Sequence, residues 1–311
     1  MDVSVIIVCM NRPDILFPCL DGIIANTRCS YEIMVVAYRF SPDNLEALKA
    51  AYPGVKVLEN NELCGFSENN NIALKEACGR FCFIVNDDTL MNMPVIDTLL
   101  ADFDRLPEGA AAVSPRIVFP DGRVQTCGRA PWNARRYMRH YLHLVDETKP
   151  GRWTMNEGLF QTWTLNGACF LARTDAFREA GWFDETFTFT PEDIALGQKF
   201  NAMGYTVWTD ADAVITHIAG GTVSRMESAI KPTRVRGALI YYSGGSKLKY
   251  ALLGCYVCAV EACRHLRYLP CDRSDPDSRA AISFRTSGNV LRTVFSGLST
   301  KEIFTRLYNE L

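Results

Sequence analysis

The sequence predicts an α/β fold in which a doubly wound, mixed and mainly parallel sheet is flanked by helices and followed by a helical C-terminal extension. Short runs of β-branched, almost continuously apolar residues are typical of strands buried on both faces of a parallel sheet. These runs alternate with segments in which apolar residues recur at helical spacing. The 311 residues, 48% hydrophobic and 22% charged, suffice for one large domain or two ordinary ones and exclude a disordered or coiled-coil chain.

The first part of the chain shows a regular β-α-β-α-β-α-β alternation. Apolar runs predict four strands, over 3–9, 31–36, 55–58 and 80–85. Helical spacing predicts the intervening helices, over 15–26, 42–51 and 66–78. Ser41 before Pro42 supports the second helix, because Ser caps helices and Pro suits the first helical position.

The rest of this region is less regular. Segment 120–160 is polar and aromatic, and we expect it to be a loop that carries a cluster of arginines. The other segments predict helices over 94–106, from Thr174 onward and over 192–203, and strands over 110–118, 167–172, 206–208 and 213–215. These elements extend the same sheet.

The formal net charge of −2 conceals two oppositely charged regions. Residues 1–224 carry 19 Lys and Arg against 28 Asp and Glu, a net charge of −9. Residues 225–311 carry 14 against 7, a net charge of +7. We therefore divide the chain into a domain of residues 1–225 and a helical, basic extension of residues 226–311. Because the whole chain has no basic excess, no nucleic-acid partner is expected.

The extension contains an apolar run over 250–260 with basic flanks at Lys247, Lys249, Arg264 and Arg267. Such a segment can lie on an anionic membrane surface, or it can be a helix packed into a core. No stretch reaches the roughly 18 apolar residues of a spanning helix. The start of the sequence lacks the basic segment of a secretory signal, and cysteine is too sparse for a disulfide scaffold. We expect a cytoplasmic protein with free thiols, at most peripheral at the inner face of the membrane.

Two neighbouring carboxylates, Asp87 and Asp88, follow the fourth predicted strand. Open α/β sheets bind their ligands at the carboxyl ends of parallel strands, which is where this pair lies. Carboxylate oxygens are preferred ligands of hard divalent cations, and Mg²⁺ or Mn²⁺ often bridges a protein to a diphosphate. The alternative is a solvated turn, because Asp and Asn favour turns in any fold.

A second acidic pair, Glu192 and Asp193, opens a predicted helix. It follows Thr190 and Pro191, so helix capping alone accounts for the pattern: Thr190 as N-cap, Pro191 in the first position and acids in the first turn. The functional alternative is a carboxylate that is fixed at a helix start and serves as a general base.

A third candidate, His217, follows the predicted strand 213–215 and precedes Gly220 and Gly221. A lone histidine is usually structural or lies at the surface. The functional alternative is a metal ligand, because a neutral imidazole can complete a mixed oxygen and nitrogen site with a carboxylate such as Asp88.

These motifs, in this order, resemble those of glycosyltransferase family 2 with its GT-A fold, and its rhamnosyltransferase-like branch in particular. Val3–Pro13 (VSVIIVCMNRP) is similar to the family's VSVIIVTYNRP start, and Asn86–Thr89 (NDDT) to its NPDT form of the D-x-D motif. Five further segments match family motifs. Asn61–Asn71 matches N-x-G-F-A-x-x-x-N, Asn166–Arg173 matches GA-x-x-L-x-R, and Gly181–Glu185 matches GGFDE. Glu192–Asp193 matches the ED of EDVDL, and His217–Gly221 matches H-x-GG. The likeness covers about residues 1–225.

The resemblance implies an inverting glycosyltransferase of cell-surface polysaccharide synthesis, which moves a sugar from a nucleotide diphosphate sugar to a hydroxyl group of a glycan or lipid-linked acceptor. It implies that Asp193 is the general base, supported by Glu192. It also implies that Asp88 and His217 bind Mg²⁺ or Mn²⁺ on the donor diphosphate. The substrate-binding residues that it implies are Met10, Asn11, Pro13, Tyr38, Asn71, Asp87, Trp163 and Asn166.

The sequence departs from the family pattern at two positions. Ala37 stands where the family has the Asp of VVDNGS, and Ala195 stands at the second acid of EDVDL. Without the first carboxylate, base recognition is left to backbone groups or to stacking on Tyr38. These losses keep a second interpretation open, a catalytically inactive relative that only binds sugar nucleotides. The donor sugar, nucleotide base, acceptor and oligomeric state are not predicted.

Overall fold

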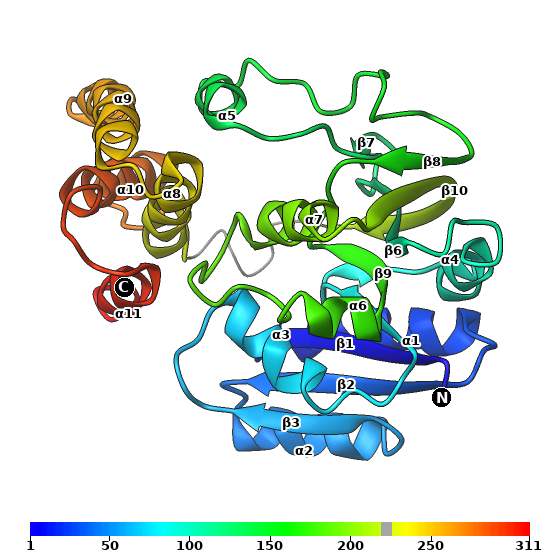
Figure 1. The fold of residues 1–311 in the computed structure, drawn as a ribbon. Coiled ribbons are helices and arrows are strands. Elements are labelled where there is room, and N and C mark those ends of the chain that lie inside the picture. The colour runs from blue at the N-terminus through cyan, green and yellow to red at the C-terminus, as the bar shows by residue number, and fades with distance from the viewer. Residues whose placement is uncertain (219–225) are drawn as a thin grey trace.

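A ten-stranded mixed sheet forms the centre of the computed structural model, which describes residues 1–218 and 226–311 (Figure 1). The strand order is β3-β2-β1-β4-β9-β6-β10-β5, with β7 beside β6 and β8 beside β10. The strands are β1 (Val3–Met10), β2 (Tyr31–Tyr38), β3 (Lys56–Asn60), β4 (Phe81–Val85), β5 (Thr89–Leu90), β6 (Ala110–Val118), β7 (Val124–Thr126), β8 (Leu159–Thr162), β9 (Cys169–Arg173) and β10 (Thr206–His217).

The first four strands in this order are parallel, and the longest ladders, β1 with β2 and β6 with β10, are parallel as well. β9 runs antiparallel to β4 and β6 between these two parallel parts. The predicted mixed, mainly parallel sheet with flanking helices is thus confirmed. The carboxyl ends of β1, β2 and β4 meet at one edge of the sheet, where this fold class binds ligands.

Helices cover both faces of the sheet. They are α1 (Pro13–Asn26), α2 (Pro42–Ala51), α3 (Phe66–Leu74), α4 (Val95–Asp102), α5 (Ala134–Tyr141), α6 (Thr174–Glu179) and α7 (Glu192–Ala202). One core joins α1, α2 and α4 to the sheet, and a second joins α3, α6 and α7 to its other face. Strands buried between two such layers must be apolar on both faces, which explains the continuous apolar runs in the sequence.

The structure corrects three expectations. Segment 120–160 is not a loop throughout, since it contains β7, α5 and the start of β8; α5 begins at Asn133, whose side chain accepts a hydrogen bond from the backbone N–H of Arg136 at 2.9 Å. Its four Arg and His residues obscured the helical pattern. The two strands expected over 206–215 are one strand, β10, with a bulge between Asp210 and Val214. Pro191 rather than Thr190 occupies the N-cap of α7.

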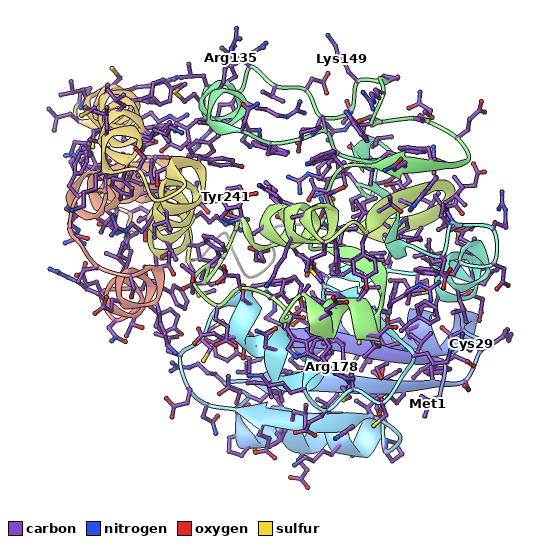
Figure 2. All side chains as sticks on the ribbon, in the orientation of Figure 1. Met1, Cys29, Arg135, Lys149, Arg178 and Tyr241 are labelled. Carbon is purple, nitrogen blue, oxygen red and sulfur yellow. The ribbon has the colours of Figure 1, made fainter. Side chains whose placement is uncertain are left out.

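The C-terminal extension is helical, as predicted, and lies at one side of the sheet (Figure 1). Its helices are α8 (Glu227–Ser243), α9 (Lys247–Tyr268), α10 (Arg279–Thr293) and α11 (Thr300–Tyr308). Apolar side chains of α8 and α11, such as Ile230 and Phe304, are buried in a cluster with Phe189. Tyr241 of α8 donates a hydrogen bond to Gln198 of α7 (Figure 2). The extension therefore shares a core with the sheet region.

A glycine permits the close approach of α8 to the start of α7. A Cβ atom at Gly237 would lie 2.7 Å from the carbonyl oxygen of Thr190, closer than such atoms pack. Any side chain at this position would push α8 away from the first turn of α7.

The apolar run of the extension lies in α9, and each of its two alternatives accounts for part of the helix. Leu253 and Val257 are buried against the neighbouring helices, as expected of a core helix. Leu252 and Leu266 are exposed. Among residues 1–218 and 226–311, no helix is both long and apolar enough to cross a membrane. All twelve cysteines are free.

Candidate active site

A cavity of about 190 Å³ opens at the carboxyl ends of β1, β2 and β4. Its walls include four of the predicted site residues, Met10, Tyr38, Asp87 and Asp88. The hydroxyl oxygen of Tyr38 accepts a hydrogen bond from the backbone N–H of Cys64 at 3.2 Å, and burial raises the pKa of Tyr38. The sequence and the strand topology thus agree on where a ligand would lie.

Asp88 and His217 face each other beside this cavity. Asp88 Oδ1 lies 3.0 Å from His217 Nε2. The other ring nitrogen, Nδ1, lies 2.9 Å from Gln125 Oε1, and the Asn86 side-chain amide lies 3.4 Å from Nε2. An amide oxygen only accepts, so Nδ1 carries a proton and donates it to Gln125. Nε2 is thus the ring nitrogen that faces the Asp88 carboxylate.

This arrangement fits a divalent cation. A carboxylate oxygen and a deprotonated imidazole nitrogen can bind the same cation, and neighbouring ligands of Mg²⁺, at about 2.1 Å from the ion, lie about 3 Å apart. Gln125 holds the ring as outer-shell partners of metal-bound histidines do. Among the described residues, no cluster of three His, Cys, Asp or Glu side chains is arranged to hold a metal, so a bound ion would need ligands from elsewhere. A diphosphate could supply them.

Asp87, the neighbour of Asp88, has different surroundings. Burial raises the pKa of Asp87 to about 7, although the side chain of Cys9 opposes the shift; the negative charge of Asp88 adds to it. The two adjacent carboxylates are therefore not equivalent: Asp88 faces His217, and Asp87 interacts with Cys9.

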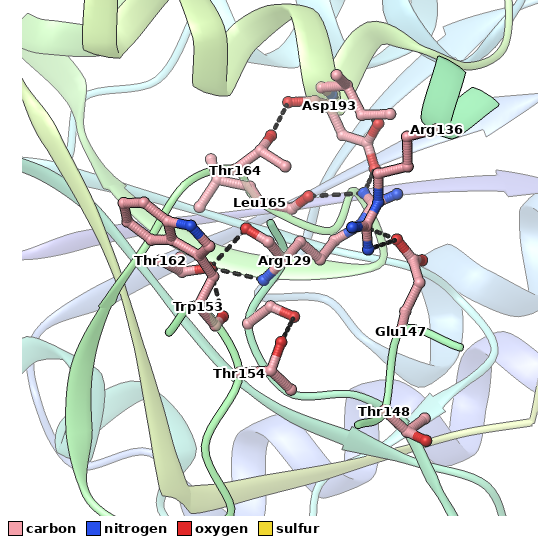
Figure 3. A network of polar contacts seen from close by, with 12 residues as sticks. Arg129, Arg136, Glu147, Thr148, Trp153, Thr154, Thr162, Thr164, Leu165 and Asp193 are labelled. Carbon is pink, nitrogen blue, oxygen red and sulfur yellow. Dashed lines mark hydrogen bonds and ion pairs between the residues drawn. The ribbon is translucent and has the colours of Figure 1, made fainter. Parts of the chain in front are cut away.

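Asp193, the predicted general base, is fixed at the first turn of α7 (Figure 3). Its Oδ2 accepts a hydrogen bond from Arg129 Nη1 at 2.7 Å and from the backbone N–H of Gly167 at 3.2 Å. Arg129 also donates to the carbonyl oxygen of Leu165 at 2.8 Å. The side chains of Arg129 and Asp193 are each only 10% exposed, so this ion pair holds the carboxylate in one orientation.

Glu192, the predicted support of Asp193, is buried without a hydrogen-bond partner for Oε2 among the described residues. Burial raises the pKa of Glu192 to about 8, and the negative charge of Asp193 acts in the same direction. Glu192 is consequently protonated at neutral pH.

One backbone segment joins the two acidic groups. The N–H of Gly167 donates to Asp193, and the carbonyl oxygen of the next residue, Ala168, accepts from the N–H of Asn86 at 2.9 Å. Asn86 directly precedes the Asp87–Asp88 pair. The start of α7 and the end of β4 are over 100 residues apart in sequence. This segment therefore brings them together at the same edge of the sheet.

Other predicted site residues do not line the cavity. The side-chain amide of Asn71 donates to the carbonyl oxygen of Phe183 and accepts from its backbone N–H. It thereby joins α3 to the segment after α6. Asn11 accepts from the backbone N–H of Ser41 at 3.0 Å, which fixes the loop after β1. Three others, namely Pro13 at the start of α1, Trp163 and Asn166, also lie outside the lining. Gly220 and Gly221 lie outside the described residues.

The sequence did not reveal two features of the site. Arg129 was only one member of an arginine cluster in an expected loop. Arg234 of α8 lines the cavity together with Ile230 and Phe304, and its Nε is buried without a hydrogen-bond partner among the described residues. The sequence pointed to Arg234 only through the basic net charge of the extension, which does not identify an individual residue.

Comparison with known proteins identifies relatives of this arrangement. A family model described as "Glycosyl transferase family 2" matches residues 4–179. The O-antigen biosynthesis protein RfbC of Myxococcus xanthus is 28% identical over 230 residues, which cover 69% of this chain and 17% of that protein. The N-acetylglucosaminyl-diphospho-decaprenol L-rhamnosyltransferase of Mycobacterium tuberculosis is 30% identical over 198 residues, 57% of this chain and 63% of that protein. The chain thus spans less than two thirds of each relative.

Solved structures are similar over nearly the whole chain. GalNAc-T7 with UDP, GalNAc and Mn²⁺ has a TM-score of 0.56 at 16% identity and covers 96% of this chain and 56% of its own. The mannosyltransferase PcManGT from Pyrobaculum calidifontis, in complex with GDP-Man and Mn²⁺, has a TM-score of 0.54 at 17% identity. It covers 99% of this chain and 86% of its own. At these identities the likeness shows the fold, and it confirms the expected GT-A architecture.

Proposed function

Because the chain belongs to glycosyltransferase family 2, we propose that it is an inverting glycosyltransferase of cell-surface polysaccharide synthesis. It moves a sugar from a nucleotide diphosphate sugar to a hydroxyl group of a lipid-linked acceptor. The names of the two relatives support this proposal, one for O-antigen biosynthesis and the other for rhamnosyl transfer to a sugar on diphospho-decaprenol. A rhamnosyl donor is therefore the first to test.

One observation carries the proposal. The Asp88–His217 pair at the end of β4 and the fixed carboxylate of Asp193 are joined through the backbone of Gly167 and Ala168. A donor diphosphate beside the first group and an acceptor hydroxyl beside the second would meet in the space between them. This is the arrangement that inverting transfer requires.

The residues divide the work of this reaction. Asp193, oriented by Arg129, takes the proton of the acceptor hydroxyl, whose oxygen forms a bond to the anomeric carbon as the bond to the diphosphate oxygen breaks. Asp88 and His217 would hold Mg²⁺ or Mn²⁺. When bound, the ion neutralises charge on the departing nucleoside diphosphate. Arg234 of α8 also lines the cavity and adds a positive charge.

A coupled assay tests the proposal. The purified chain is incubated with Mn²⁺, a panel of nucleotide diphosphate sugars that includes nucleotide diphosphate rhamnose, and a short-chain prenyl diphosphate that carries N-acetylglucosamine. We expect release of nucleoside diphosphate together with a product enlarged by one sugar of inverted anomeric configuration. Donor binding without transfer to any acceptor would instead support the binding-only relative.

A further inference from the structure

A second and larger cavity, of about 620 Å³, lies between α5, α8, α9 and α10. The helices that enclose it come together at the side of the molecule where the extension meets the arginine-rich segment (Figure 1). Its walls are rich in basic side chains, namely His140, His143, Lys231, Arg264, Arg267 and Arg279. No motif of the sequence pointed to this place, and the proposed transfer reaction does not use it.

Two of these cations are neutralised within the protein. Glu261 Oε1 lies 3.1 Å from Lys231 Nζ and accepts hydrogen bonds from Arg264 Nη1 and the Tyr141 hydroxyl, both at 2.6 Å. Glu261 is fully buried, so its carboxylate presents no negative surface to the cavity. This network of contacts holds together the helices that form the cavity wall. Glu227 is the one other carboxylate in the lining.

The remaining guanidinium groups are available for a ligand. Within the described residues, the side chains of Arg267 on α9 and Arg279 on α10 make no hydrogen bond or ion pair. Both residues are exposed, and they reach the cavity from different helices. Planar guanidinium groups bind the oxygens of phosphates with paired hydrogen bonds. The free charge of this cavity therefore favours a phosphate or diphosphate group.

Exposed leucines stand next to the lining residues. Leu142 and Leu144 flank His143 and are 43% and 61% exposed. Leucine in water is unfavourable, whereas a leucine against a hydrocarbon chain or in the interface of a bilayer is stabilised. A free phosphate would explain the arginines but not the leucines. An anionic group joined to a hydrocarbon chain explains both.

The position of the basic cavity relative to the cavity at the carboxyl ends of β1, β2 and β4, which we call the donor cavity, narrows the choice of ligand further. Lys231 lines the basic cavity, and Ile230 and Arg234 line the donor cavity. These residues lie on neighbouring faces of α8, so one helix borders both spaces. A lipid held in the basic cavity would have its anionic end beside the site of sugar transfer.

We propose that this basic cavity binds the diphosphate of a polyprenyl-linked acceptor, while the exposed Leu142 and Leu144 contact its hydrocarbon chain. The inference rests on the proposed function, since it assigns the acceptor of that reaction to a place on the extension. Arg267 and Arg279 bind the diphosphate oxygens. Leu142 and Leu144 bring this face to the membrane in which such an acceptor resides.

Binding experiments on the full chain test the proposal. Farnesyl diphosphate is titrated by calorimetry in the presence of saturating nucleoside diphosphate and Mn²⁺, so that the donor cavity is already filled. We expect the R267Q/R279Q variant to bind at least tenfold more weakly than the wild type. Neither arginine has a partner to lose, so the fold is retained. The matched control R135Q/R139Q, which removes two charges from exposed positions outside the cavity lining, retains wild-type affinity.

Further arms distinguish the sources of the phosphate. Inorganic diphosphate should bind more weakly than farnesyl diphosphate, and L142Q/L144Q should weaken only the latter. Equal affinity of R267Q/R279Q and wild type for farnesyl diphosphate would overturn the proposal. So would equal affinity for the two diphosphates, or binding to anionic phospholipid vesicles without binding to farnesyl diphosphate. Failure of the proposed function is separate, since it appears as absent nucleotide binding and transfer in the same preparations.

Discussion

The sheet region, residues 1–218, and the extension, residues 226–311, line one cavity in different ways. The sheet region contributes carboxylates that directly follow a strand, Asp87 and Asp88 after β4. The extension contributes Arg234, which projects from the middle of α8. Groups at strand ends converge because parallel strands end together, whereas a group on a helix face reaches a site only through tertiary packing. The first kind of contribution is visible in a sequence, and the second is not.

The largest expected effect separates the two regions physically. We predict that a chain ended after residue 225 loses cooperative thermal unfolding and nucleotide binding. The truncation removes the extension side chains of the cluster between the regions, among them Ile230 and Phe304, and uncovers Leu63 and Phe189 of the sheet region. Exposing a large apolar side chain costs about 2 kcal/mol, so the loss is a large part of the stability of a domain. Calorimetry and nucleotide titration provide the measurement.

The matched control for this truncation is a chain that ends after Tyr308, which keeps the whole cluster and should unfold and bind as the wild type does. A chain ended at residue 225 that still binds nucleoside diphosphate with full affinity would show that the regions are independent, and the division at residue 225 would then mark a true domain boundary.

The next effect concerns the sheet region alone. Asp193→Asn should lower kcat about 10³-fold, because an amide cannot take the acceptor proton. Its affinity for nucleoside diphosphate should stay unchanged. Steady-state kinetics and nucleotide titration separate the two quantities, with the exposed Asp104→Asn as the control. Turnover at the wild-type rate in the Asp193 variant would exclude this residue as the base.

Removal of the cation-binding carboxylate should have a smaller effect. Asp88→Asn keeps the size of the side chain but loses its negative charge, and we expect about 100-fold weaker activation by Mn²⁺. EDTA should abolish turnover of the wild-type protein, and added Mn²⁺ should restore it. Activity that is indifferent to EDTA would remove the metal role from both Asp88 and His217.

Arg234→Gln tests the contribution of the extension to the same cavity. We expect about tenfold weaker binding of nucleoside diphosphate, since one charged contact to the phosphates is lost, and unchanged binding of the nucleoside without phosphates. Arg306→Gln, on the exposed side of α11, is the control. If the Arg234 variant binds both ligands as the wild type does, the extension supports the site only by packing.

The difference between the regions also explains how much of the fold and of the site could be predicted from the sequence. Strand runs, helix starts and the acidic pairs at Asp87–Asp88 and Glu192–Asp193 are local patterns, and the structure has the corresponding elements at these places. Asn71 lies outside the cavity lining, and its amide hydrogen bonds to the backbone of Phe183 within the fold. Helix α5 was missed because its polar, arginine-rich turns gave no apolar stripe. Arg129 and Arg234 acquire their roles from contacts between distant segments, which no local pattern contains.

The smallest effect concerns the pH dependence of stability. The pKa of Glu192 rises from an ordinary 4.5 to about 8 in the folded protein, because of burial and the adjacent charge of Asp193. Between these pH values the folded protein keeps a proton that the unfolded chain has released. The free energy of unfolding must therefore fall as the pH rises through this window, and the stabilisation is complete only below about pH 4.5.

Glu192→Gln is neutral at every pH, so it lacks this slope. From pH 5 to pH 8, the Tm of the wild type should fall several degrees more than that of the variant, and Asp104→Asn should follow the wild type. Parallel curves for wild type and variant would contradict the raised pKa. Arg234 opposes the shift at Glu192. In Arg234→Gln the fall in Tm should therefore continue to higher pH, because the extension would no longer act on the acidic pair of α7.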